Sequence, residues 1–437
     1  MTAQRNDMSD RAKMLLSRGP LRVLTAVAVA VLAATSLAAC GGGDVASKPK
    51  SPVAEQLDWL VSEVNGDSAT LAQSEVEAHL ANSYLDALPA AQVISFVKQA
   101  RSAYAPIRLV GFAGHPSAAS GIALVETRQQ QKLAIYASVD GSPEHRITGL
   151  DVAERPAIGA TEMAAARRYT GAFDIGGRKM FLNCSGSGSP TVILEAGANA
   201  GSHSWFAVQP WLATTTRVCS YDRANVPGGS SDPGNKPQTA ASIVSDLHRL
   251  LRAAELPGPY LFAGHSNGGL FARLYATTYP KEVLGLVLID TGNYPAIQRT
   301  LYKKLGTPTQ WKAYQAYQRN TAPFVENAAD EQVDLEASYA QMAKAQRRHP
   351  LPRMPLVVIS HGIPDPSAGR EALPGLNKAT EKLWQQTQIN LATLVPGGRR
   401  IVATKSHHPI PTEQPGLIVQ TIRALLTPSP ASLASRR

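Results

Sequence analysis

A tight turn between an apolar segment and an amphipathic segment is the feature that most restricts the fold of this chain. Residues 260–263 read Tyr-Leu-Phe-Ala and predict a strand, which runs through Gly264, Ser266 and Gly268 into a helix predicted over Gly269–Tyr279. Only glycines let neighbouring backbones approach closely enough for such a turn, which holds the serine strained and exposed. The N-terminus of the following helix favours an anion beside it. We therefore expect Ser266 to be a nucleophile.

Short apolar segments alternate with amphipathic segments through the whole C-terminal part of the chain. Strands are predicted over Lys179–Cys184, Thr191–Glu195, Arg217–Tyr221, Tyr260–Ala263, Val283–Ile289, Leu356–Ser360 and Arg400–Thr404. Helices are predicted over Ser204–Ala213, Thr239–Glu255, Gly269–Tyr279, Ala379–Leu394 and Gln414–Leu426. Alternation of this kind predicts an α/β fold with a mostly parallel sheet that helices cover on both faces. Reactive groups are then expected at the carboxyl ends of the strands.

The preceding region has a different order of elements. Helical spacing of apolar residues covers Ala54–Val64, Glu75–Leu88 and Ala91–Ala103, and strand-like segments follow at Ile107–Phe112, Ser120–Arg128, Lys132–Val139 and His145–Asp151. Helices first and a meander afterwards predict a small α+β domain. In element order it resembles the cystatin-like and steroid-isomerase-like modules that precede some exported bacterial hydrolases. It carries no cluster of acid, base and nucleophile, so a binding or spacer role is expected.

The N-terminus has the features of an export signal. Five Lys and Arg residues accompany an apolar run over Leu21–Ala34, and small residues lead to Leu37-Ala38-Ala39-Cys40. The order predicts a secretory signal peptide at residues 1–39. Its end resembles the bacterial lipobox, which implies that Cys40 is lipidated and becomes the mature N-terminus. The apolar run is shorter than the roughly 20 residues that a bilayer span needs. We expect a lipid-anchored protein on the outer face of the cytoplasmic membrane.

Composition and charge exclude several classes of protein. An apolar share of 44% with 17% charged residues is typical of a globular chain. Residues 1–39 contribute 3 of the net charge of +10, so the mature chain would carry +7. Its basic residues are scattered and no nucleic-acid motif is present, so nucleic-acid binding is not expected. No metal site or organic cofactor is predicted either, and the sequence makes no prediction of oligomeric state.

The segment around Ser266 resembles the α/β-hydrolase superfamily, and the resemblance extends from about residue 171 to residue 426. Ala196-Gly197-Ala198-Asn199 follows a predicted strand where many members have His-Gly and then the oxyanion residue. The departure is Ala196 in place of histidine. The resemblance implies that the backbone N–H groups of Ala198 and Asn267 form the oxyanion hole. Tyr221-Asp222-Arg223 is similar to the segment before the nucleophile helix and is expected to order a loop beneath the site.

The general base is predicted near the C-terminal end. Residues 406–415 read Ser-His-His-Pro-Ile-Pro-Thr-Glu-Gln-Pro and resemble the Ser-Gly-His-x-Ile and Gln-Pro pattern of the family. In that register His408 is the base and His407 occupies the glycine position. The other interpretations are a surface pair of histidines or a metal site, but adjacent histidines in an extended segment point to opposite sides and chelate poorly.

Two aspartates compete for the acid that orients the base. Asp365 follows the predicted strand Leu356–Ser360 with the Gly-x-x-Asp spacing that is common in the superfamily, and Asp290 closes the preceding strand, a position that some lipase relatives use. Both satisfy the chain order serine, acid, histidine. We favour Asp365 and keep Asp290 as the alternative.

Two further features accompany the predicted site. Residues 291–353 interrupt the alternation and predict a cap, whose aromatic side chains line a pocket or pack the cap on the sheet. These aromatic residues include Tyr302, Trp311, Tyr314, Tyr317, Phe324 and Tyr339. Cys184 and Cys219 remain after lipidation of Cys40, either as a disulfide or as two small buried hydrophobes. In the resembled fold the second strand runs antiparallel beside the fourth, which implies that these two cysteines form a disulfide.

The sequence thus predicts an extracytoplasmic serine hydrolase that cleaves a carboxylic ester, or an amide, through an acyl-Ser266 intermediate. The alternatives are an inactive scaffold that serves as an envelope binding protein, and a related acyltransferase or haloperoxidase. The expected divisions are a signal peptide at 1–39, a lipidated tether at 40–52, an α+β domain at 53–155, a hydrolase domain at 156–428 with a cap at 291–353, and a disordered tail at 429–437.

Overall fold

The computed structural model describes residues 50–66, 71–113, 118–155, 168–312, 315, 331–364 and 377–427. The chain divides into two compact units, Met1–Ala165 and Ala166–Arg437, and each has its own hydrophobic core. The predicted signal peptide, Cys40, most of the tether and the C-terminal tail lie outside the described residues. Within the described ranges, no helix is both long and apolar enough to cross a bilayer.

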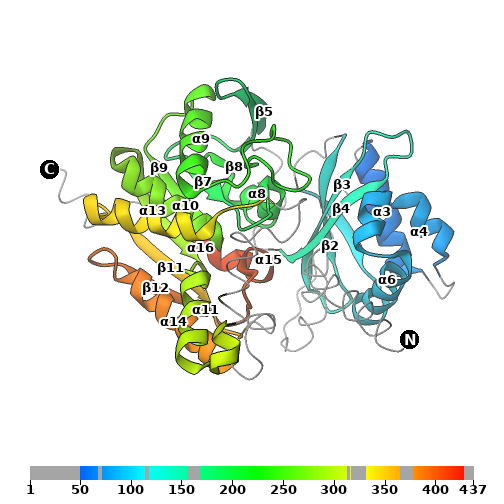
Figure 1. Cartoon of the computed structure of the whole chain (residues 1–437). Helices are drawn as coiled ribbons and strands as arrows, with labels where there is room; N and C mark the ends of the chain where they lie inside the picture. Colours follow the sequence, from blue (N-terminus) through cyan, green and yellow to red (C-terminus); the bar gives the residue numbers. More distant parts are fainter. Residues whose placement is uncertain are drawn as a thin grey trace. The chain divides into compact units, whose positions relative to one another are not determined.

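The first unit is a four-stranded antiparallel sheet packed against helices (Figure 1). Its strands follow chain order as β1 (Arg108–Phe112), β2 (Ser120–Glu126), β3 (Lys132–Val139) and β4 (Ile147–Glu154). Its helices are α3 (Pro52–Asn65), α4 (Gln73–His79), α5 (Asn82–Ala87) and α6 (Ala90–Tyr104). The hydroxyl of Ser51 caps α3, and the helix buries Leu57 and Val61 against the sheet. The predicted α+β order is confirmed.

The second unit contains an eight-stranded, mostly parallel sheet in the order β12-β11-β10-β9-β7-β8-β6-β5. The strands are β5 (Arg168–Asp174), β6 (Lys179–Ser185), β7 (Val192–Glu195), β8 (Val218–Tyr221), β9 (Tyr260–His265), β10 (Val283–Ile289), β11 (Leu356–His361) and β12 (Arg399–Ala403). Only the pairs of β6 with β5 and with β8 are antiparallel. Every residue of β7, β8 and β11 is buried, as expected for strands covered on both faces.

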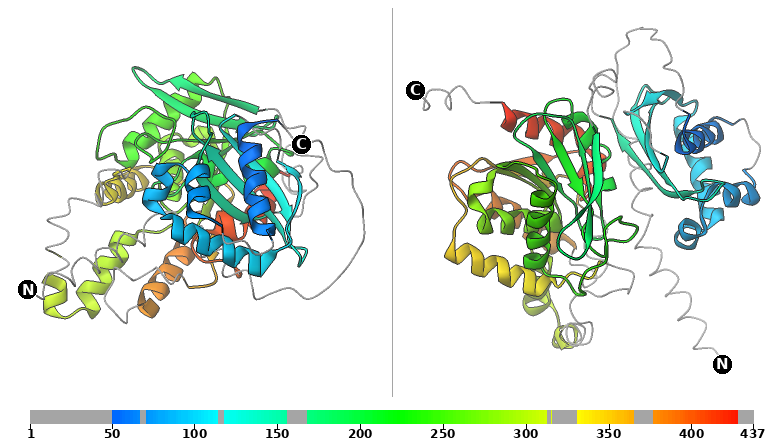
Figure 2. Two further views of the ribbon diagram at one scale, coloured as in Figure 1. Left: turned by 90° about the vertical axis from the view of Figure 1, so that its right-hand side faces the viewer. Right: turned by 90° about the horizontal axis from the view of Figure 1, so that it is seen from above.

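Helices lie on both faces of this sheet (Figure 2). They are η2 (Ser202–Trp205), α8 (Gln209–Leu212), α9 (Ala240–Ala253), α10 (Asn267–Thr278), η3 (Pro280–Glu282), α11 (Tyr294–Leu305), α13 (Leu335–Arg348), α14 (Asn377–Ala392), α15 (Ile410–Glu413) and α16 (Pro415–Leu426). Helices α9, α10 and α13 pack together over Phe262 and Leu286. Helix α8 packs with α16, which contacts β10. This is the α/β-hydrolase fold, which confirms the predicted fold class.

Some local predictions were wrong. The helix expected over Ser204–Ala213 is a 3-10 turn followed by the short helix α8, because Pro210 has no N–H to continue a helix and begins a new one instead. Strand β5 was not anticipated, since Gly171 interrupts its apolar pattern. Helix α13 lies within residues 291–353, whose assignment as a cap stays a prediction, and buries Met342 in the main core beside α9 and α10.

The predicted disulfide is present. Cys184 of β6 and Cys219 of β8 are paired residues in antiparallel register, and their sulfurs are bonded. Both side chains are buried. The bond joins the antiparallel edge of the sheet to its parallel part.

Candidate active site

Ser266 lies at the turn between β9 and α10 in a backbone conformation that residues other than glycine rarely adopt. Its φ of 53° and ψ of −122° fall in a region that costs on the order of 1–3 kcal/mol for a residue with a Cβ atom. The glycines on either side make the turn possible. A Cβ atom on Gly264 would lie 2.5 Å from the carbonyl oxygen of Gly268, and a Cβ on Gly268 would lie 2.2 Å from that of Glu195. The predicted need for both glycines is confirmed.

His408 lies in the loop between β12 and α15 and faces the serine. The hydroxyl of Ser266 is 3.0 Å from Nε2 of His408, although the two residues are 142 positions apart. The residue before the serine also holds the His408 loop, because Nε2 of His265 donates to the carbonyl oxygen of His408 at 2.9 Å. His407, the other member of the pair, turns toward Glu413 instead, with its Nδ1 3.3 Å from that carboxylate. The register that selected His408 over His407 therefore matches the geometry.

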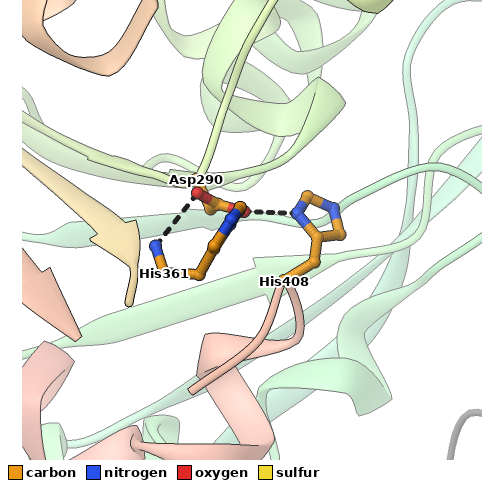
Figure 3. A group of neighbouring side chains, drawn as sticks. All are labelled: Asp290, His361 and His408. Carbon is orange, nitrogen blue, oxygen red and sulfur yellow. Dashed lines mark hydrogen bonds and ion pairs between the residues drawn. The ribbon is translucent and has the colours of Figure 1, made fainter. Parts of the chain in front are cut away.

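Asp290 provides the carboxylate that contacts His408. It follows β10, is fully buried, and places Oδ2 2.6 Å from Nδ1 of His408 (Figure 3). An acceptor at Nδ1 fixes the proton on that nitrogen and leaves Nε2 free to accept the serine proton. Asp365, which the sequence favoured, lies outside the described residues. The contact that the acid of a triad must make is made by Asp290, the alternative.

Three residues around Asp290 were not anticipated. Trp384 of α14 donates from Nε1 to Oδ1 of Asp290 at 3.0 Å, and its ring meets the ring of His408 edge to face. His361, the last residue of β11, donates to Asp290 from its backbone N–H at 3.1 Å and lies 2.7 Å from Oδ2 through Nδ1. Its Nε2 is 3.0 Å from Glu381 of α14. The signal available in the sequence was a histidine at the end of a predicted strand, together with Glu381 and Trp384 three residues apart on one helix.

The charges of this group are strongly coupled. Burial raises the pKa of Asp290, but hydrogen bonds from His361 and His408 outweigh it and hold that pKa well below its usual range. Burial lowers the pKa of His361, whereas its hydrogen bonds to Asp290 and Glu381 and their charges raise it, to about 10 overall. The carboxylate is therefore ionised and His361 is a cation at neutral pH.

The same three side chains also carry atoms of the kind that bind metal ions. One ligand atom each from Asp290, His361 and His408 lie within 4.8 Å of one another. Both Nδ1 atoms, however, face the same carboxylate oxygen at hydrogen-bond distance, so a metal ion would have to displace both protons. The arrangement fits a hydrogen-bonded group better than a metal centre.

The predicted oxyanion loop follows β7 and lies against the serine. A Cβ atom on Gly197 would be 3.3 Å from Cβ of Ser266, so the backbone that leads into Ala198 borders the nucleophile. Asn267 is the first residue of α10, and its N–H has no acceptor within the helix. Asn267 thus begins the helix that follows Ser266, and Ala198 lies in the loop that borders Ser266.

Arg223 holds the loop after β7 in place through hydrogen bonds. Its buried guanidinium donates to the carbonyl oxygens of Ala196 at 2.9 Å and Gly197 at 2.6 Å. It also pairs with two buried carboxylates, Glu195 at 2.9 Å and Glu331 at 2.5 Å. Glu331 in turn accepts from the N–H of Asn199 at 3.2 Å. The prediction that the segment ending in Arg223 orders a loop beneath the site is confirmed.

Comparisons to known families agree with the fold. Residues 190–346 match the family model described as the alpha/beta hydrolase fold, and residues 48–144 match that described as ORF 12 gene product N-terminal. The first match supports placing the second unit in the α/β-hydrolase superfamily and supports a hydrolase.

Individual relatives are distant. The chain is 25% identical over 238 residues to YqjL of Bacillus subtilis (strain 168), which covers 53% of this chain and 82% of that protein. It is 32% identical over 127 residues to probable transporter efuK of Hormonema carpetanum, which covers 28% of this chain and only 18% of that protein. The enol-lactonase of Burkholderia xenovorans LB400 is similar in structure with a TM-score of 0.40 and 17% identity, over 60% of this chain and 100% of that one.

Proposed function

We propose that this protein is a serine hydrolase that cleaves a carboxylic ester, or an amide, through an acyl-Ser266 intermediate. The observation that carries the proposal is the continuous contact from Oγ of Ser266 through His408 to Asp290, at 3.0 Å and 2.6 Å. Each atom is the one that the chemistry requires: a hydroxyl, the Nε2 of an imidazole and a carboxylate on Nδ1. The superfamily match supports a hydrolase in general, and the triad supports this reaction class.

In the proposed reaction, Oγ of Ser266 attacks the substrate carbonyl while Nε2 of His408 takes the hydroxyl proton. Asp290 stays ionised and stabilises the imidazolium that forms. His408 then gives the proton to the leaving alcohol or amine, which departs and leaves the acyl group on the serine. A water molecule, deprotonated by the same imidazole, releases the acid and restores Ser266.

The backbone N–H groups of Ala198 and Asn267 are proposed to stabilise the oxyanion of both tetrahedral intermediates. Support comes from the close approach of Gly197 to Ser266 and from the bracing of the loop by Arg223. A donor of this kind is worth on the order of 10²–10³-fold in kcat in serine hydrolases. Because backbone groups donate, the loss of the family's histidine at Ala196 does not remove them.

We further propose that the enzyme acts on small-molecule or lipid esters at the outer face of the cytoplasmic membrane, where diacylated Cys40 anchors it. The support is the order of basic residues, apolar run and Leu37-Ala38-Ala39-Cys40 in the sequence. Two acyl chains are enough for durable membrane binding. The residues between Cys40 and α3 would connect the anchor to the first unit.

A fluorophosphonate probe and a series of p-nitrophenyl esters test the proposal. We expect the wild-type chain to be labelled and to hydrolyse the esters, and Ser266→Ala to do neither. Ser245→Ala, which changes an exposed serine on α9, is the matched control and should behave as wild type. Absence of labelling and hydrolysis in the wild-type chain would reject the enzyme and favour a binding module.

A further inference from the structure

The proposed triad uses only one of the two histidines that contact Asp290. His361 reaches the same carboxylate oxygen as His408, at 2.7 Å against 2.6 Å (Figure 3). It is buried at the end of β11, with 2% of its surface exposed, and both of its ring nitrogens face carboxylates. The role of this second imidazole is not explained by the hydrolysis itself.

Hydrogen bonding determines the charge of His361. Nδ1 faces Asp290, and Nε2 faces Glu381 with both carboxylate oxygens within 3.1 Å. Ionised carboxylates only accept hydrogen bonds, so both ring nitrogens must carry protons. His361 is therefore an imidazolium, held between two carboxylates.

An imidazolium at this position has an electrostatic cost for catalysis. Asp290 assists the reaction because its negative charge stabilises the positive charge that His408 acquires. A permanent cation 2.7 Å from the same carboxylate would cancel much of that assistance. The negative charge of Glu381, on the far side of His361, restores a net charge of minus one to the group of three.

We propose that Glu381, His361 and Asp290 form a charge-balanced chain, in which His361 positions the carboxylate of the triad and Glu381 compensates the charge of His361. Both are positioning residues, since neither touches the reacting atoms. This inference rests on the proposed function of Ser266 and His408. It adds to the triad an extension through β11 and α14 that sets the pH at which the enzyme works.

The other polar groups around His361 support the arrangement. Gln385 of α14 donates to Glu381 at 2.6 Å and to the backbone carbonyl of His361 at 3.2 Å, which ties the helix to the end of the strand. Arg400 of β12 donates to Ser360 at 2.8 Å and interacts electrostatically with Asp290 and Glu381. Two further charged groups, Arg400 and, once protonated, His408, thus interact with the group formed by Asp290, His361 and Glu381.

Substitutions that remove one charge at a time test the proposal. In His361→Asn the amide replaces Nδ1 as a donor to Asp290, but the cation is lost. His408 is then protonated more easily, and the acid limb of the kcat/KM profile should move to higher pH by about one unit. In Glu381→Gln the anion is lost and the acid limb should move by a similar amount to lower pH. The double variant loses both charges and should return close to the wild-type profile.

The matched control is Glu282→Gln. Glu282 also pairs with a histidine, His248 at 3.2 Å, but it precedes β10 whereas Asp290 follows it. The Glu282→Gln variant should leave the pH profile of kcat/KM unchanged. Shifts of both single variants in one direction, or a fall in kcat without any shift, would overturn the proposal, because a merely structural role predicts those results.

A readout independent of activity separates this inference from the proposed function. In full-length protein with ¹⁵N-labelled histidine, nuclear magnetic resonance should show His361 doubly protonated from pH 6 to pH 8, in the wild type and in Ser266→Ala. A neutral His361 ring at pH 7 would overturn the charge-balanced chain. Because this measurement uses the wild-type residue, it decides the question even if His361→Asn does not fold. A doubly protonated ring in a wild-type chain without esterase activity would instead reject the proposed function and leave the chain of charges intact.

Discussion

Oδ2 of Asp290 lies 2.6 Å from Nδ1 of His408, and the two residues are 118 positions apart in the sequence. The contact brings the end of β10 to the loop after β12, across the strand β11 that separates them in the sheet. It leaves the opposite nitrogen of the ring 3.0 Å from the hydroxyl of Ser266. The direction of proton transfer in the proposed reaction depends on this one contact.

Replacing Asp290 by Asn should therefore abolish most activity. The amide would present an N–H group to Nδ1, favour the wrong tautomer of His408, and lower kcat by about 10⁴-fold. Asp365→Asn is the matched comparison and should change kcat by less than about threefold. Steady-state kinetics on a p-nitrophenyl ester would distinguish them, and a larger loss in the Asp365 variant would reassign the acid.

Loss of Arg223 should destabilise the second unit. Arg223→Met would leave Glu195 and Glu331 buried without their cation, which is expected to cost about 3–5 kcal/mol of unfolding free energy. Arg178→Met removes a more exposed cation from Asp246 and should cost about 1 kcal/mol or less. Urea unfolding monitored by fluorescence measures both. Equal losses would contradict a special role for the buried cluster.

The raised pKa of His361 predicts a pH dependence of stability. Burial lowers this pKa, but Asp290 and Glu381 raise it to about 10, against an ordinary value of 6.5. The folded chain thus keeps a proton that the unfolded chain releases above pH 6.5. The stabilisation is complete below that pH and is lost as the pH rises toward 10, with an amplitude on the order of a few kcal/mol.

Urea unfolding of the wild type and of His361→Asn at pH 6 and pH 9 checks this dependence. Other titrating groups act in both proteins and cancel in the comparison. The wild type should lose more unfolding free energy between the two pH values than the variant does. A parallel decline in both proteins would show that His361 is not the group responsible.

The disulfide should contribute to stability by restricting the unfolded chain. Its cysteines are 35 residues apart, and closing a loop of that length is worth about 4 kcal/mol in the chain-entropy description. Cys184→Ala combined with Cys219→Ala should lower the urea midpoint accordingly. Alkylation of the unfolded wild type should modify both cysteines only after reduction, and modification without reductant would contradict the bond.

The lipid anchor is tested by metabolic labelling. Cells given labelled palmitate should incorporate it into the wild-type chain, and the chain should fractionate with membranes. Cys40→Ser removes the thiol that would receive the lipid and should abolish the label. Equal labelling of both proteins would reject the anchor while leaving the proposed hydrolysis unaffected.

Much of the site could be predicted because its signals are local. The turn at Ser266 needs glycine at 264 and 268, because a Cβ atom at these positions would lie only 2.5 Å and 2.2 Å from a backbone oxygen, so the sequence itself shows where the chain bends. The alternation of apolar and amphipathic segments likewise predicted the parallel sheet, because strands buried on both faces must be continuously apolar.

The acid could not be chosen in this way. Asp290 and Asp365 both follow predicted strands, and neighbouring parallel strands end at the same edge of the sheet. Each is therefore compatible with the order serine, acid, histidine. His361 and Glu381 escaped notice for a related reason, since neither lies in a motif and their importance comes from a contact between a strand end and a helix face.

The sequence by itself determined the class of fold and pointed to the proposed nucleophile and base, because backbone geometry and hydrophobic periodicity depend on residues that lie close together along the chain. Only the tertiary structure decided which carboxylate contacts His408 and which groups, His361 and Glu381, lie near that carboxylate. Those relationships join positions 290, 361, 381 and 408, and they depend on the order and register of β10, β11 and β12, which local sequence patterns do not encode.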